Sequence, residues 1–123
     1  MSVLLSNHLI TIKFDGRSTK MGAYTSTSVF EIQNTLPILI NPIKTEYSRT
    51  GNHWTDYYQL ELGKTYLIVV TDISNKGMHH CYYYTAKATP EGLKTTNAEV
   101  HLTVDVLRVM CKCLLKKIFS RRD

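Results

Sequence analysis

The sequence has no apolar run long enough to cross a membrane, because no stretch approaches the roughly 18 apolar residues that a spanning helix needs. The first residues, MSVLLSNHLITIKF, contain too short an apolar stretch for a signal peptide, and no N-x-S/T sequon occurs. The cysteines number only three, Cys81, Cys111 and Cys113, and this odd count argues against a disulfide framework. We therefore expect a protein of a reducing compartment, the cytoplasm.

The sequence also lacks the local signatures of the common enzyme classes. It has no nucleophile elbow, no glycine-rich phosphate loop, no metalloprotease helix and no paired-carboxylate motif. Cys81 beside a histidine is the one candidate nucleophile, and no family signature surrounds it. We expect no catalytic residues and no cofactor.

The stretch MHHCYYYTAKA (78–88) raises the question of a metal, because His79 and Cys81 would share one face of a strand. Structural zinc needs four converging nitrogen and sulfur ligands, usually in paired spacings such as C-x-x-C or H-x₃-H. Neither spacing occurs in the sequence. Partly exposed strand histidines and a small buried cysteine explain the stretch, so we expect no metal site.

The positive charge is confined to one end of the chain. Residues 106–123 hold six basic residues and one acid, which accounts for the whole net charge of +5. The remaining chain carries nine basic and nine acidic residues and is neutral. A neutral body with a basic end is not typical of a protein whose whole surface binds nucleic acid.

Short segments of alternating apolar and polar residues, separated by turn residues, predict a mainly β protein. The expected strands are 8–14, 28–33, 44–47, 53–62, 64–74, 78–88 and 98–106. Segment 36–43 is apolar but holds Pro37 and Pro42, which predicts an edge strand or a kinked connection. This spacing is typical of an antiparallel β-sandwich or small barrel.

Several of these segments carry more specific expectations. Asp15-Gly16 predicts a turn that ends the first strand, and the nearly continuous apolar run 64–74 predicts a central strand covered on both faces. Segment 78–88 is expected to be its hairpin partner, with Cys81 and some of the tyrosines packed inward.

The period of the apolar residues changes after 105 and predicts an amphipathic helix. We therefore divide the chain into a β domain, 1–105, and a basic C-terminal helix, 106–123. The basic residues are Arg108, Lys112, Lys116, Lys117, Arg121 and Arg122. Such a helix could pack on its own domain, or it could dock on an anionic membrane surface, with acylation of Cys111 or Cys113 as a second anchor. It could equally dock in an acidic groove of a partner or on nucleic acid.

The stretch LELGKTYLIVVTDISNKG (60–77) resembles the sixth-strand region of fibronectin type III domains. The matching residues are Leu60, Gly63, Tyr66, Ile68, Val70, Asn75 and Gly77. The resemblance implies an immunoglobulin-like sandwich with a tyrosine corner, in which the tyrosine hydroxyl bonds backbone a few residues upstream. It also implies a protein-interaction module that makes contact through exposed loops or a sheet edge.

We therefore expect a non-enzymatic binding protein whose partner is another protein. Pairing of two copies of the chain into a homodimer is a further possibility. A small stand-alone domain of this kind is also typical of a viral accessory protein. The candidate contacts lie in two turns: Arg49, Asn52, His53 and Trp54, and Asn75, Lys76, His79 and His80. The alternative is single-stranded nucleic-acid binding, with bases stacked on Trp54, Tyr57, Tyr82 and Tyr84 and phosphates drawn to the basic tail; the neutral body makes nucleic acid the weaker expectation.

Overall fold

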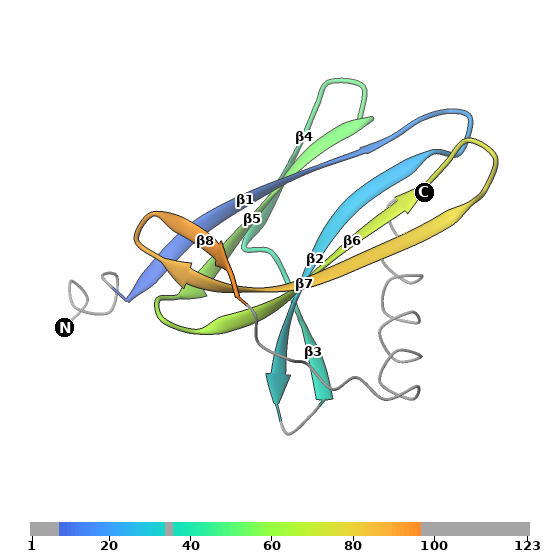
Figure 1. Ribbon diagram of the computed structural model, residues 1–123. Helices are drawn as coiled ribbons and strands as arrows, with labels where there is room; N and C mark the ends of the chain where they lie inside the picture. The colour runs from blue at the N-terminus through green and yellow to red at the C-terminus, as the bar shows by residue number, and fades with distance from the viewer. Residues whose placement is uncertain (1–7, 34–35, 97–123) are drawn as a thin grey trace.

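The computed structural model describes residues 8–33 and 36–96, and in this part of the chain the fold is entirely β (Figure 1). Alternating β-branched and aromatic residues favour extended backbone throughout. The strands are β1 (Leu9–Ser18), β2 (Tyr24–Gln33), β3 (Leu36–Ile40), β4 (Lys44–Tyr47), β5 (His53–Glu61), β6 (Thr65–Ile73), β7 (His79–Thr89) and β8 (Gly92–Thr95).

All eight strands belong to one antiparallel sheet, in the order β4-β5-β1-β2-β6-β7-β8, with β3 paired to β2 off this path. The pairing of β1 with β2 is short and involves only Arg17–Thr25 and Ser18–Tyr24. By contrast, β1 pairs with β5 along nearly its whole length, from Leu9–Glu61 to Arg17–His53. The sheet thus has two halves that are joined by a short seam at one end.

The two halves enclose a common core. Buried residues of β5, such as Tyr58 and Leu60, cluster with Val29 of β2 and with Tyr66 and Ile68 of β6. At the opposite edge, β8 contacts β1, so the sheet curls back on itself (Figure 1). The apolar faces that the alternating sequence creates are buried in this way.

The Tyr66 hydroxyl accepts a hydrogen bond of 2.9 Å from the backbone N–H of Glu61, five residues upstream. This is the backbone contact that the tyrosine-corner expectation requires. Close by, Lys64 of the β5–β6 turn forms an ion pair with Glu31 of β2. Both interactions fix the corner where the chain passes from one half of the sheet to the other.

The central position of 64–74 and its hairpin with 78–88 are confirmed, because β6 lies between β2 and β7 and is largely buried. The edge position of the proline-containing segment is also confirmed, since among the described strands β3 pairs with β2 alone. The predicted turn at Asp15-Gly16 is wrong. β1 continues to Ser18 because its pairing with β5 extends through both residues, and Asp15 lies opposite Thr55.

The inward packing expected for Cys81 and some of the tyrosines is also wrong. Every residue of β7 from His79 to Tyr84 is exposed, and burial begins at Thr85. The alternation of the sequence could not reveal this, because in this part of β7 both faces of the strand are open.

Three expectations lie outside the described residues. They are the strand 98–106, the helix 106–123 and the domain boundary between 105 and 106. The basic residues and the two cysteines of that helix lie there as well.

Replacing Tyr66 with phenylalanine removes the acceptor of the Glu61 N–H. We expect the free energy of unfolding to fall by about 1 kcal/mol or more, because a partly buried backbone donor loses its partner. Denaturant titration would measure this loss. The control is Tyr82→Phe, in which an exposed hydroxyl is removed, and equal effects of the two substitutions would contradict the tyrosine-corner role.

Candidate interaction surface

Three turns gather at one end of the sheet, because the strand registers align their ends (Figure 1). Arg17 pairs with His53, Ser18 with Tyr24, Tyr24 with Ile73, and Ile73 with His79. The β1–β2, β4–β5 and β6–β7 turns all lie just beyond this row of paired residues. Both predicted contact segments therefore belong to the same end of the molecule.

In each of the two predicted segments, a serine accepts a hydrogen bond across the turn and a glycine adopts a positive φ. In the β4–β5 turn the Ser48 hydroxyl accepts a hydrogen bond of 3.1 Å from His53 N–H, and Gly51 has a φ of 78°. In the β6–β7 turn Ser74 accepts similarly from Met78 N–H at 3.2 Å, and Gly77 has a φ of 79°. A positive φ favours glycine, so both turns have a defined backbone shape that presents their side chains.

The structure brings seven of the eight predicted contact residues to this surface. Those that are exposed are Arg49, Asn52, His53, Asn75, Lys76, His79 and His80. Trp54 is the exception, because it is only 3% exposed and clusters with Tyr24 and Ile73. The prediction of Trp54 as an exposed contact is therefore wrong; the indole supports the surface from beneath.

Trp54 lies directly on the backbone of Gly16, its partner in the β1–β5 register. A Cβ atom at position 16 would fall 2.2 Å from the indole Nε1, far inside contact distance. Because Gly16 has no side chain, the Trp54 ring fits between β1 and the ring of Tyr24. The centres of the Trp54 and Tyr24 rings are 5.5 Å apart. The same glycine that predicts a turn in the sequence serves here as a packing site within a strand.

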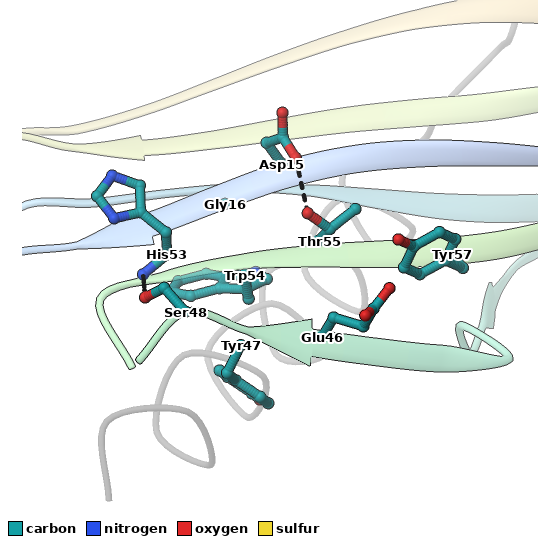
Figure 2. A pocket seen from close by; sticks show the side chains of 9 residues that line it. All are labelled: Asp15, Gly16, Glu46, Tyr47, Ser48, His53, Trp54, Thr55 and Tyr57. Carbon is teal, nitrogen blue, oxygen red and sulfur yellow. Dashed lines mark hydrogen bonds between the residues drawn. The ribbon is translucent and has the colours of Figure 1, made fainter. Parts of the chain in front are cut away.

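A shallow hollow of about 500 Å³ lies beside this ring, between β1 and the β4–β5 hairpin (Figure 2). Asp15 accepts a hydrogen bond of 3.0 Å from Thr55, and the ring of Tyr57 lies beside the Glu46 carboxylate on the adjacent strand (Figure 2). Exposed Tyr47 adds a second aromatic ring, 6.3 Å from Trp54. The hollow therefore offers carboxylates, hydroxyls and aromatic rings together.

Tyr57 is the electrostatic centre of this hollow. Its hydroxyl hydrogen-bonds with Glu46, which raises the pKa of the phenol and lowers the pKa of the carboxyl group. The ammonium groups of Lys13 and Lys44 lie 5.4 Å and 4.6 Å from the centre of its ring. Charges of both signs thus surround one tyrosine, an arrangement suited to a polar partner surface.

A second hollow, of about 370 Å³, lies between the β1–β2 and β6–β7 turns. Its wall includes Asp72, which accepts a hydrogen bond of 3.1 Å from Thr25, together with Arg17 and Asn75. With the first hollow it forms an uneven surface of mixed polar and apolar groups on the end where the three turns meet. We call this surface the turn end.

The sequence analysis missed Asp15, Glu46, Tyr47 and Asp72 at the turn end. Each lies on a strand beside a turn, so it reaches the surface through strand pairing that local sequence does not reveal. Segments 13–17 and 44–47 come together only because β1 and β4 both pair with β5.

The four aromatic residues considered for base stacking do not share a face. Trp54 is buried, and Tyr57 lies on β5, separated from β7 by β1, β2 and β6. Tyr82 and Tyr84 are exposed, and the Tyr82 ring stacks with His80 at 6.4 Å. A smaller aromatic strip therefore remains on β7.

Within residues 8–33 and 36–96, no three His, Cys, Asp or Glu side chains come close enough to hold a metal ion. The same residues include no helix that is long and apolar enough to span a membrane.

No protein-family model matches this chain, and neither the curated proteins nor the solved structures include a significant match.

Replacing Gly16 with alanine tests the contact with Trp54. We expect a loss of about 1–3 kcal/mol of unfolding free energy, since the added methyl group would overlap the indole. In a strand without such a contact, the same change would instead stabilise by roughly 0.5–1 kcal/mol. The double variant G16A/W54F should recover part of the loss in denaturant titration, and additive effects of the two substitutions would contradict the contact.

Replacing Tyr57 with phenylalanine tests the electrostatic centre of the first hollow. Because the tyrosine hydroxyl stabilises the charged form of Glu46, its removal should move the pKa of Glu46 upward, toward its usual value of about 4.3. A carbon-detected NMR titration would measure this shift, with Tyr47→Phe as the control. In the wild-type protein, the hydrogen bond between Tyr57 and Glu46 stabilises the fold at pH values above the usual glutamate pKa. This stabilisation is lost as the pH falls through the lowered pKa of Glu46. An unchanged Glu46 pKa would contradict the assignment.

Proposed function

We propose that this chain is a non-enzymatic protein-interaction module that binds another protein through the turn end. The observation that carries the proposal is the convergence of three turns and two hollows lined by charged, hydroxyl and aromatic residues at one end of the sheet. Loops that a rigid sheet positions are a common place for binding residues. The exposed residues there combine arginine, tyrosine and charges of both signs, as polar protein interfaces do.

We further propose that the fold is an immunoglobulin-like or fibronectin type III-like sandwich. The hydrogen bond between Tyr66 and Glu61 and the core shared by the two halves of the sheet support this assignment. In such sandwiches the loops cluster at the two ends, and one cluster commonly makes the contact. The turn end corresponds to one of these clusters.

The basic segment 106–123 has the separate role of localising the module at an anionic membrane surface in the cytoplasm. The six basic residues of this segment and the pair Cys111 and Cys113 support this role. Co-sedimentation of the full chain with anionic vesicles tests it. Replacing the six basic residues with glutamine should abolish sedimentation, and raising the salt concentration should weaken it.

The second candidate function is single-stranded nucleic-acid binding by the aromatic strip on β7. The stacked and exposed His80 and Tyr82, together with exposed Tyr84, favour it. Titration of labelled oligonucleotides by fluorescence anisotropy distinguishes the two functions. Affinity that falls strongly with Tyr82→Ala and is unaffected by substitutions at the turn end would favour nucleic acid over protein.

The double variant R49A/K76A tests the turn end by removing one exposed cation from each predicted segment. We expect the amount of bound partner protein to fall about tenfold or more, because arginine is among the residue types whose removal from an interface costs the most binding free energy, and tenfold corresponds to about 1.4 kcal/mol. Affinity capture with quantitative mass spectrometry would measure the partner that wild-type protein retains.

The matched control is K87A/K94A, which removes two exposed lysines that pair across β7 and β8, toward the opposite end of the sheet. It should retain the partner at the wild-type level. Equal loss in both variants would show that general charge, and not the turn end, determines the binding.

A further inference from the structure

Strands β2 and β6 have two apolar faces, and β5 covers one of them. Val29 of β2 lies opposite Ile68 of β6, and both cluster with Tyr58 and Leu60 of β5. Residues next to Val29 and Ile68 along each strand point to the opposite side of the sheet. We call the side that faces β5 the inner face and the opposite side the outer face.

The outer face carries a second apolar cluster, which we call the outer cluster: Phe30, Leu67 and Val69. Phe30 lies opposite Leu67 of β6 and opposite Leu39 of β3, and Val69 lies two residues beyond Leu67 on the same face. Phe30 and Leu67 are 0% exposed, and Val69 is 1% exposed. The outer cluster is therefore buried as deeply as the core between the two halves of the sheet.

Such burial requires a second layer above the sheet, because an apolar sheet face is shielded from water only by another element packed on it. Within residues 8–33 and 36–96, the partly buried apolar residues that pack against the outer cluster are Ile32 and Leu39. Both belong to β2 and β3, in the same layer as the cluster itself. The described strands thus supply the lateral neighbours of the outer cluster and not its cover.

The described chain ends on this same face. Thr85 of β7 lies opposite Leu67, so its side chain belongs to the outer face. Thr96 is the last described residue, and its N–H donates to the Thr85 carbonyl at 2.9 Å. The hydroxyls of the two threonines lie 2.6 Å apart. Segment 97–123 therefore begins beside the outer cluster.

The other segments outside the described ranges are less suited to cover it. Residues 1–7 lead into β1, whose Leu9 pairs with Glu61 in the other half of the sheet. Residues 34 and 35 join β2 to β3 and supply only an asparagine and a threonine. Segment 97–123 alone combines a start beside the outer cluster with an apolar stripe.

We propose that residues 106–123 form the predicted amphipathic helix and that this helix docks on the outer face through its apolar stripe. The stripe residues recur at intervals of three and four, as one side of a helix requires: Leu107, Met110, Cys111, Leu114, Leu115 and Ile118. Arg108, Lys112 and Lys116 recur at intervals of four and form a basic ridge on another side of the helix. Docking buries the stripe against the outer cluster and leaves the basic ridge in water.

The dimensions of the sheet permit this arrangement. Strands β7, β6, β2 and β3 are successive neighbours, so the outer face is about 14 Å wide at about 4.8 Å per strand. A helix over 107–118 would be about 18 Å long. Residues 97–106 span up to about 33 Å when extended, which is enough to bring the helix over any part of the outer cluster.

Docking gives different surroundings to the two cysteines of the segment. Cys111 belongs to the stripe and is covered, whereas Cys113 falls outside the stripe and remains accessible to an acylating enzyme. The basic ridge likewise remains free to meet an anionic surface. The inference is independent of the protein partner of the turn end, and it does not require membrane binding.

Thiol labelling of the full wild-type chain tests the docking. We expect iodoacetamide to modify Cys111 about tenfold or more slowly than Cys113, because Cys111 reacts only when the helix opens away from the sheet. Lys112 separates the two cysteines, so tryptic peptides analysed by mass spectrometry give both rates. The ratio should be independent of protein concentration, since docking occurs within one chain, and it should disappear in denaturant.

A pair of matched variants tests whether the helix lies on the outer face. Val69→Thr adds a hydroxyl on the outer face, and Val70→Thr adds the same hydroxyl on the inner face, since adjacent residues point to opposite sides. Because a buried hydroxyl without a partner disfavours the docked state, V69T should accelerate the labelling of Cys111 about tenfold. V70T should leave that rate within about twofold of wild type, and far-UV circular dichroism checks that both variants retain their β structure.

Equal labelling of Cys111 and Cys113 in the wild-type chain would overturn the proposal and would show that something other than this helix covers the outer cluster. Protection of Cys111 that disappears on dilution would overturn it too, because a second copy of the chain would then be the cover. Protection that V69T and V70T affect alike would also contradict it, since the helix would not lie on the face that carries Val69.

Discussion

The packing of the Trp54 indole on the bare backbone of Gly16 is the contact on which the arrangement of the sheet depends. Only two residue pairs join β1 to β2, so hydrogen bonding alone ties the halves of the sheet weakly. Trp54 lies next to this seam and also packs against Tyr24 and Ile73 of the other half. One ring thereby joins the two halves at the end where the turns converge.

The polar character of the turn end follows from this buried support. Because Trp54 and Tyr24 point inward, the residues that alternate with them on β5 and β2, among them Thr55 and Thr25, point outward and bond to Asp15 and Asp72. The hollows are therefore polar on the outside and aromatic underneath. Large exposed apolar side chains occur on β7 (Tyr82, Tyr83 and Tyr84), on β3 (Leu36 and Ile38) and in the β1–β2 turn (Met21).

The pattern of apolar residues in the sequence was sufficient to locate most strands and the central position of β6, because these features depend on local pattern. The hydrogen bond of Tyr66 was expected from the resemblance to fibronectin type III domains. It failed at Asp15-Gly16, where a dipeptide typical of turns lies inside a strand. The reason is a contact with Trp54 of a strand distant in sequence, and no local rule describes it. The exposure of Cys81 and the tyrosines was missed for a related cause: alternation shows that two faces differ in direction, but it does not show what covers each face. The position of the turn-end residues that lie on strands, such as Glu46 and Asp72, depends on strand register, which the local sequence does not predict.

The pairing of β1 with β5 has a consequence for the order in which the chain can fold. The partner of Leu9 is Glu61, and three other strands lie between β1 and β5 in sequence. During synthesis, β1 leaves the ribosome before β5 and therefore cannot complete its pairing until β5 has been made. Closing so long a loop costs chain entropy before any pairing offsets it, and domains dominated by such distant contacts fold slowly. The hairpins β4–β5 and β6–β7 can form early, whereas the Trp54–Gly16 contact can form only when β1 docks and completes the sheet.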